Sequence, residues 1–126
     1  MSGLRGADVI AFVSTADMAR ARAFYADVLG LALTDENPFA LVFDANGTML
    51  RVTATDAVVK ATYTVLGWRV GDIVASAREL SGHGVELVRY DGMGQDELGI
   101  WTTPSGDRVA WFRDPDGNTL SLTQFA

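Results

Sequence analysis

Apolar and polar residues follow the same order twice along this chain. In each copy a short apolar strand ends near an aspartate, Asp17 in the first copy and Asp72 in the second, and a helix with one apolar face follows. Further strands and turns come next, and each copy closes on a strand that follows a turn containing Gly47 or Gly117. A repeat of this kind indicates two equivalent units. The pattern predicts two consecutive β-α-β-β-β modules, which form an α+β fold.

The first copy contains one predicted helix and four predicted strands. Apolar periodicity predicts a helix from Met18 to Leu29, with Asp17 as its N-cap and Gly30 directly after its end. Residues of high strand propensity predict strands at 9–14, 31–34, 39–43 and 48–54. The turn at 45–47 contains asparagine and glycine, which tolerate positive φ and therefore favour a tight hairpin.

The second copy repeats this plan with a longer insertion. The sequence predicts a helix from Ile73 to Leu80 and strands at 63–70, 85–90, 100–103, 108–113 and 119–124. Residues 91–99 are acidic and rich in glycine, so they are predicted to form a loop that could act as a lid. The chain is interpreted as one domain, residues 1–126, of two modules, about 8–54 and 63–124, joined by a linker at 55–62.

Size and composition narrow the classes of function. The chain has 126 residues, 48% of them hydrophobic, which suits one domain; each copy of about 60 residues alone would be marginally stable. A net charge of −6 argues against nucleic acid or an anionic membrane as partner. The sequence has no cysteine, so disulfides and thiolate chemistry are excluded. No stretch has the length of a signal peptide or membrane span, and we expect a cytoplasmic location.

Two groups of residues resemble those of a known family. In the first copy they are Thr15-Ala16-Asp17, Ala23-Phe24-Tyr25 and Val28-Leu29-Gly30-Leu31. In the second copy they are Val70-Gly71-Asp72, Gly84-Val85-Glu86-Leu87 and Trp111-Phe112-Arg113-Asp114-Pro115-Asp116-Gly117-Asn118. Their order and spacing resemble the vicinal oxygen chelate superfamily, which includes glyoxalase I, bleomycin-resistance proteins and extradiol dioxygenases. The resemblance covers nearly the whole chain. It implies a curved, mostly antiparallel, eight-stranded open barrel around a central pocket, with both helices on the convex face.

The resemblance also implies where metal ligands would lie. Metal-binding members place one ligand on the first strand of each module, seven residues before the helix-capping aspartate, and one on the last strand, four residues after the turn glycine. Those positions hold Ile10, Val65, Arg51 and Ser121 in this chain. Divalent metals need imidazole and carboxylate ligands, and Arg51 would repel a cation. We therefore expect no metal at the family position and no cofactor.

Other candidate metal or catalytic residues have simpler interpretations. The one histidine, His83, lies between two glycines after a helix, where we expect a structural or solvent-exposed role. The segment 114–118 lacks the ligand spacing of a calcium loop, and its acids are expected to serve turn formation. The sequence contains no phosphate-binding loop and no nucleophile elbow.

Strand alternation predicts which residues line the pocket. If the former ligand positions point inward, six residues are candidates for binding a ligand: Phe12, Arg51, Arg69, Trp101, Ser121 and Thr123. This set suits a small, partly aromatic ligand with an anionic or carbonyl group, which arginine binds well. The alternative is that the arginines pair with acids at the edge of the pocket. Trp68, Trp111 and Phe112 are further candidates for an aromatic wall, although aromatic side chains in small domains usually belong to the core.

Three functions remain open from the sequence. The first is a metal-independent protein that binds, sequesters or carries a small molecule, as the bleomycin-resistance proteins do. The second is a lyase or isomerase that uses Tyr25, Tyr63 or an arginine in the same cavity. The third is a structural dimer with a vestigial cavity. Short two-module members of the family dimerise, so we expect a homodimer. Whether modules pair within the chain or across the dimer stays open, as do the ligand and any reaction.

Overall fold

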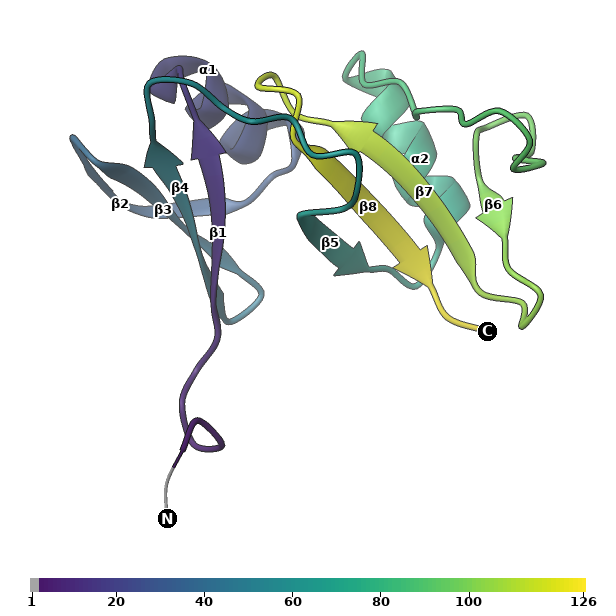
Figure 1. Ribbon diagram of the computed structural model, residues 1–126, viewed down its shortest axis with the longest axis horizontal. Coiled ribbons are helices and arrows are strands. Elements are labelled where there is room, and N and C mark those ends of the chain that lie inside the picture. Colours follow the sequence, from purple (N-terminus) through teal and green to yellow (C-terminus); the bar gives the residue numbers. More distant parts are fainter. Residues whose placement is uncertain (1–2) are drawn as a thin grey trace. The chain divides into compact units, whose positions relative to one another are not determined.

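The protein folds into two compact units in the computed structural model, which describes residues 3–126 (Figure 1). Unit 1 comprises residues up to 57, and unit 2 comprises residues 58–126. Each unit contains one four-stranded sheet and helical structure on one face of that sheet. The predicted α+β class and the twofold repeat of its elements are therefore confirmed. The finer module bounds stay a prediction.

Unit 1 forms a mixed sheet. Its elements are β1 (Ile10–Thr15), α1 (Met18–Arg22), the π-helix η1 (Ala23–Val28), β2 (Ala32–Asn37), β3 (Ala40–Ala45) and β4 (Thr48–Ala54). The strands lie in the order β1-β4-β3-β2. The first strand pairs parallel with the last, and the other neighbours pair antiparallel. The helical segment therefore forms the crossover between β1 and the rest of the sheet.

The helix of unit 1 differs from the prediction in its second half. It begins as expected, because the Asp17 side chain accepts a hydrogen bond from the Arg20 N–H at 3.1 Å. From Ala23 onward it continues as a π-helix, in which the Leu29 N–H donates to the Phe24 carbonyl at 2.9 Å. Such wide turns are rare. The predicted helix from Met18 to Leu29 is helical as far as Val28, but apolar periodicity did not show that residues 23–28 are of the π type.

The core of unit 1 lies between this helix and one face of the sheet. The Tyr25 side chain is fully buried, and its ring meets Phe24 edge-on at 5.3 Å and Phe43 at 6.0 Å between centroids. The other buried apolar sheet residues on this face are Val13, Leu41, Leu50 and Val52. Packing of these apolar side chains supplies most of the stability of such a unit.

Unit 2 repeats the same topology. Its elements are β5 (Leu66–Arg69), α2 (Ile73–Gly82), β6 (Trp101–Thr102), β7 (Arg108–Arg113) and β8 (Thr119–Gln124). The strand order is β5-β8-β7-β6, with β5 parallel to β8. The predicted N-cap Asp72 accepts from the Ala75 N–H at 3.1 Å, and the Gln124 side chain accepts from the Ile73 N–H at 2.8 Å. No helix within residues 3–126 is long and apolar enough to cross a membrane.

The predicted strand at 85–90 is wrong. This extended segment makes a backbone bond to the outer side of β7, from the Val88 N–H to the Trp111 carbonyl at 2.7 Å, but it forms no continuous ladder. Farther along β7, the two-residue strand β6 takes the edge position instead. Residues 91–99 separate these two segments as the predicted loop. Strand propensity is local and cannot show that an insertion divides one edge strand into two parts.

The core of unit 2 lies between α2 and the sheet. Trp68 on β5 and Phe112 on β7 stack with ring centroids 6.3 Å apart, and Phe112 is fully buried. The α2 residues Ile73, Ala77 and Leu80 are also buried. Phe112 therefore belongs to the packed core, and its candidacy for an aromatic wall of the pocket is wrong; Trp68 is half-buried and lies with it on the helix side of the sheet.

The hairpin between β3 and β4 supplies a test of local backbone strain. Asn46 and Gly47 have φ values of 51° and 93°, as the predicted tight turn requires. We expect Gly47→Ala to lower the free energy of unfolding by about 1 kcal/mol, because a Cβ disfavours positive φ. Gly71→Ala is the matched control, since Gly71 lacks positive φ and has open space around its Cα. Equal effects in urea unfolding, followed by circular dichroism, would contradict this account.

Candidate functional site

Each sheet has a second face that its helix does not cover, which we call the helix-free face. In unit 1 the parallel pairing of β1 with β4 sets Ile10 beside Met49, Phe12 beside Arg51 and Ser14 beside Thr53. Paired residues share a face of a sheet. Because their neighbours Val13 and Val52 are buried toward the helix, these six residues lie on the helix-free face. Two predicted site residues, Phe12 and Arg51, are thus direct neighbours.

Arg51 lies in the middle of this face. It pairs with Phe12 on one side and with Val42 of β3 on the other. Its guanidinium has no carboxylate within 4.0 Å among residues 3–126, and Phe12 is 57% exposed. The register also places Asp35 and Asp44 on this face, toward β2. The sequence missed these two acids because its strand ranges ended before both of them.

The helix-free face of unit 2 is built in the same way. Its residues on β5, β8 and β7 follow from the register, and they are Gly67, Arg69, Val109, Trp111, Arg113, Thr119, Ser121 and Thr123. Arg69, Ser121 and Thr123 are predicted site residues on these strands, and Arg69 and Thr123 are direct partners; Trp101 on β6 shares the face because it pairs with Val109. These three strands place no acidic side chain on this face. The face therefore carries two cations, an aromatic ring and the hydroxyls of Ser121 and Thr123, while the buried Thr119 hydroxyl donates to the Ala61 carbonyl at 2.9 Å.

Three aromatic rings form one cluster at the outer side of this face. Trp101 and Trp111 are stacked with centroids 6.1 Å apart and an interplanar angle of 27°. Tyr90 meets Trp111 edge-on, at 5.3 Å and 90°. We call Tyr90, Trp101 and Trp111 the aromatic cluster. The sequence singled out both tryptophans but missed Tyr90, because it lies at the start of the insertion and its partner Trp111 is distant in sequence.

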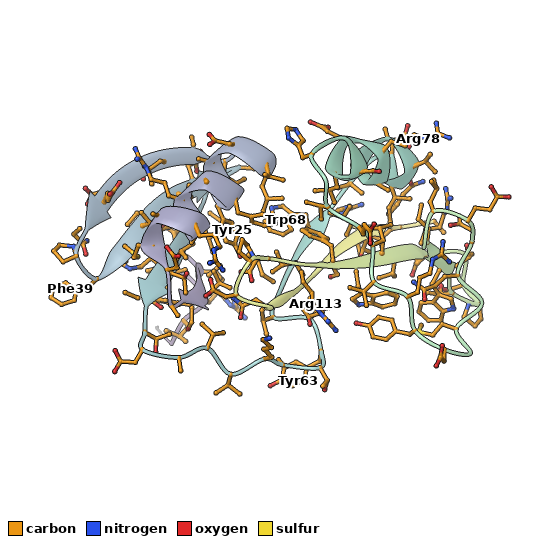
Figure 2. All side chains as sticks on the ribbon, turned by 90° about the horizontal axis from the view of Figure 1, so that it is seen from above. Tyr25, Phe39, Tyr63, Trp68, Arg78 and Arg113 are labelled. Atoms are coloured by element: carbon orange, nitrogen blue, oxygen red, sulfur yellow. The ribbon has the colours of Figure 1, made fainter. Side chains whose placement is uncertain are left out.

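The two arginines lie at opposite ends of the face. Arg69 pairs with Thr123, and Arg113 pairs with Thr119. The Arg69 guanidinium lies over the Phe125 ring, 5.2 Å from its centroid, which is a cation–π contact. Arg113 lies on the side of the sheet away from α2, whose Arg78 projects on the other side (Figure 2). Neither Arg69 nor Arg113 makes an ion pair in the described part of the chain.

Gly67 leaves room for the Ser121 hydroxyl at the centre of this face. It pairs with Ser121, and a Cβ at position 67 would lie 2.8 Å from the Ser121 Oγ. A larger side chain would therefore compete directly with the serine hydroxyl. Ser121 is 7% exposed and lies between Gly67 and Trp111 in the sheet. The predicted site residue Ser121 thus depends on a glycine at the neighbouring position.

The positions that hold metal in related proteins do not fit a divalent ion in this chain. Ile10 and Arg51 are diagonal neighbours on the helix-free face of unit 1, and Val65 and Ser121 have the same relation in unit 2. Two apolar side chains, a guanidinium and a hydroxyl lack the imidazole and carboxylate donors that such metals require. No cluster of three or more potential metal ligands occurs in residues 3–126.

The other candidate groups have structural roles or exposed positions. The Asp114 carboxylate accepts hydrogen bonds from the Asp116 and Asn118 backbone N–H groups at 3.0 and 2.9 Å, which confirms the interpretation as turn chemistry. Tyr25 lies in the core on the helix side, so it is not available to a ligand on the helix-free face. Tyr63 is 70% exposed, and His83 is an exposed residue at the end of α2.

The contact between Gly67 and Ser121 generates a double-mutant prediction. We expect Gly67→Ala to destabilise the protein by about 1 kcal/mol, because the new methyl group forces the buried Ser121 hydroxyl to move. In a Ser121→Ala background the same change should be neutral or stabilising by up to about 1 kcal/mol, since alanine restricts the unfolded chain. Chemical denaturation of the four proteins measures this coupling. Additive effects would show that the two positions do not compete for space.

Comparisons with known proteins place this architecture in a family. The model of the Glyoxalase/Bleomycin resistance protein/Dioxygenase superfamily matches residues 7–122. No curated protein shows significant similarity to the sequence.

Solved structures share the fold at low sequence identity. Lactoylglutathione lyase from Agrobacterium tumefaciens has a TM-score of 0.72 and 18% identity, covering 94% of this chain and 93% of that chain. TioX from Micromonospora sp. ML1 has a TM-score of 0.73 and 18% identity, covering 96% and 100%. The fosfomycin resistance protein FosX from Listeria monocytogenes has a TM-score of 0.76 and 16% identity, covering 100% and 95%. With a family match over most of its length, this chain belongs to the glyoxalase/bleomycin resistance/dioxygenase superfamily, the vicinal oxygen chelate proteins.

Proposed function

We propose that this protein binds a small aromatic molecule with an anionic group, and that it does so without a metal ion. The ligand-binding residues are Phe12 and Arg51 on the helix-free face of unit 1. On the helix-free face of unit 2 they are Arg69, Trp101, Ser121 and Thr123. Sequestering or carrying such a molecule is the corresponding function. Structural neighbours in the family include both a lyase and resistance proteins, so the fold alone does not choose between these roles.

The observation that supports this proposal most directly is the chemistry of the helix-free face of unit 2. Arg69 and Arg113 flank the hydroxyls of Ser121 and Thr123 beside stacked tryptophans, and β5, β7 and β8 place no acid on that face. Guanidinium groups bind carboxylates through paired hydrogen bonds, and indole rings stack on planar apolar surfaces. The chain as a whole carries a net charge of −6, so this local arrangement runs against the overall charge.

Arg51 supports the same class of ligand from unit 1. A guanidinium among apolar neighbours such as Phe12 and Val42 loses hydration, and this loss is offset when an anion pairs with it. No protein carboxylate in residues 3–126 lies close enough to form that ion pair. A ligand carboxylate, phosphate or carbonyl would therefore be a suitable partner for Arg51.

Two alternatives remain as proposals of lower rank. A lyase or isomerase would need a proton-transfer group at the site. Strands β5, β7 and β8 place arginines and hydroxyls but no carboxylate or imidazole on the helix-free face of unit 2, and the carboxylates on the helix-free face of unit 1 are Asp35 and Asp44. A structural dimer with a vestigial cavity would bind no small molecule. Turnover of a tested compound would favour the first alternative, and thermal stability unaffected by any compound would favour the second.

We expect Arg51→Met to weaken binding of an aromatic anion without unfolding the protein. A suitable ligand for the test is 1-naphthoate, with the uncharged 1-naphthamide as its matched control. Loss of a hydrogen bond to a charged group costs roughly 1.5–3 kcal/mol, which corresponds to a roughly 10- to 150-fold increase in Kd for the carboxylate. Calorimetric titration measures both ligands, and Arg69→Met should act in the same direction.

Arg20→Met is the matched control variant. Arg20 is exposed on α1 and its guanidinium lies 3.7 Å from the Asp17 carboxylate, away from the helix-free face. The Arg20→Met substitution removes the same charge as Arg51→Met and should leave the affinity for 1-naphthoate unchanged. Equal losses in the Arg20 and Arg51 variants would indicate a general charge effect and contradict a specific role for Arg51.

The proposal of metal independence has a direct test by native mass spectrometry. Protein dialysed against zinc, nickel and iron should retain well under one equivalent of metal, because the positions of Ile10, Arg51, Val65 and Ser121 offer no adequate donor set. The same spectrum reports subunit number and any ligand that copurifies. We expect the mass of two chains. Stoichiometric metal that raises the melting temperature would contradict the proposal and make glyoxalase chemistry the better hypothesis.

A further inference from the structure

The side chain of Gln95 bonds to both flanks of the insertion between the extended segment 85–90 and β6. We propose that Gln95 is a positioning residue, which fixes Tyr90 and Trp101 against Trp111 and so determines the shape of the aromatic cluster. The consequence for ligand selectivity rests on the function proposed above. The positioning itself can be tested without any ligand.

The carboxamide of Gln95 accepts one hydrogen bond and donates two. Its Oε1 accepts from the Tyr90 backbone N–H at 2.7 Å. Its Nε2 donates to the Val88 carbonyl at 2.9 Å and to the Gly99 carbonyl at 2.7 Å. These partners define the orientation of the amide, because a flipped group would face donors with a donor and acceptors with an acceptor. No other residue type of this length offers one acceptor and two donors in a planar group.

The Gln95 side chain bonds backbone groups that would otherwise pair with a neighbouring strand of the sheet. The Val88 N–H donates to the Trp111 carbonyl of β7, so the next ladder position on that side would bring Tyr90 opposite Val109. Val109 pairs with Trp101 instead. The backbone groups of Val88 and Tyr90 that would have continued the ladder are bonded to Gln95. The carboxamide therefore supplies the acceptor and the donor that two separate backbone groups of a neighbouring strand would otherwise provide.

Further bonds make the insertion a fixed loop. The Arg89 guanidinium donates to the backbone carbonyls of Asp96, at 2.9 Å, and Glu97. The Asp96 carboxylate accepts from the Leu98 and Ile100 N–H groups, both at 2.9 Å. Such bonds at the base of the loop do not favour the interpretation of residues 91–99 as a lid. They favour a fixed loop whose hydrogen bonds hold the two flanks of the insertion together.

The hydrogen bonds of Gln95 connect this loop to the aromatic cluster. Gln95 bonds directly to the backbone of Tyr90 on one flank, and it bonds to Gly99 two residues before Trp101 on the other flank. Both aromatic residues then contact Trp111 on the adjacent strand. Loss of the carboxamide would leave three backbone groups without their partners, and the two flanks could then separate. The contacts of the Trp111 ring with Tyr90 and Trp101 depend on the distance between these flanks.

The test uses the three tryptophans of the intact protein, labelled with 5-fluorotryptophan and observed by fluorine NMR. Gln95→Met keeps the side-chain length and removes the carboxamide. We expect the Trp101 and Trp111 signals to shift or broaden while the Trp68 signal, from the helix side of the sheet beside Phe112, keeps its position. Single Trp→Phe variants assign the three signals. Gln95→Glu, which keeps the acceptor and loses the donors, is the second variant if Gln95→Met does not fold.

Gln124→Met is the matched control for a general loss of stability. Its side chain also bonds a backbone N–H, that of Ile73 at the start of α2, but it does not contact the aromatic cluster. The control should lower stability without moving the Trp101 and Trp111 signals. Unchanged signals in both Gln95 variants, or equal changes in the Gln124 variant, would overturn the proposal.

Binding of 1-naphthoate separates this inference from the proposed function. If the wild-type protein binds it, the Gln95 variant should bind at least tenfold more weakly, and the Gln124 variant should bind normally. Undiminished affinity in a Gln95 variant with altered fluorine signals would overturn the link to selectivity. If the wild-type protein does not bind any aromatic anion, the proposed ligand class fails, and the fluorine signals still decide whether Gln95 positions the cluster.

Discussion

Parallel pairing between the first and last strand of each unit is the constraint on which the candidate site depends. Once β1 is bonded to β4 and β5 to β8, alternation assigns every side chain to the helix side or to the helix-free face. A shift of one residue would exchange the two sets and put Arg51 into the apolar core. The buried residues Leu50 and Val52 on either side of Arg51 make that shift very unfavourable. The core therefore fixes the position of the functional residues that it does not contain.

The same constraint explains how two equivalent frameworks carry different chemistry. In unit 1 the pair at the centre of the helix-free face is Phe12 with Arg51, and in unit 2 the corresponding pair is Gly67 with Ser121. A large aromatic residue and a cation in one unit thus correspond to a glycine and a hydroxyl in the other. Neither pair lies on the helix side of its sheet, so these positions can differ while both units keep the same topology.

The sequence predicted the parts of the fold that depend on local chemistry. The capping aspartates and the tight turn at Asn46-Gly47 depend on hydrogen bonds and φ preferences that neighbouring residues determine. The strands β4, β7 and β8 have the predicted bounds because their alternation is regular. The resemblance to the family also predicted the twofold architecture.

The features that the sequence did not predict depend on contacts between distant residues. The π-helix leaves no mark in apolar periodicity, and the divided edge strand depends on Gln95, whose role appears only when Val88 and Gly99 are brought together. For the same reason Trp68 and Trp111 were equal candidates in the sequence, although one lies on the helix side of the sheet and the other lies on the helix-free face. The face of the sheet on which an aromatic residue lies follows from the register of its strand, which the sequence alone does not show.

The central claim is that the helix-free faces bind an aromatic anion without metal. Titration of metal-free, nitrogen-15-labelled protein with 1-naphthoate, followed by two-dimensional NMR, tests it most directly. The account predicts saturable shifts of the Trp101 and Trp111 indole N–H signals and of the Arg51 and Ser121 backbone amides, with little change at Trp68. It also predicts that 1-naphthamide produces weaker shifts. An absence of saturable shifts, or shifts confined to α2 and Trp68, would contradict the account.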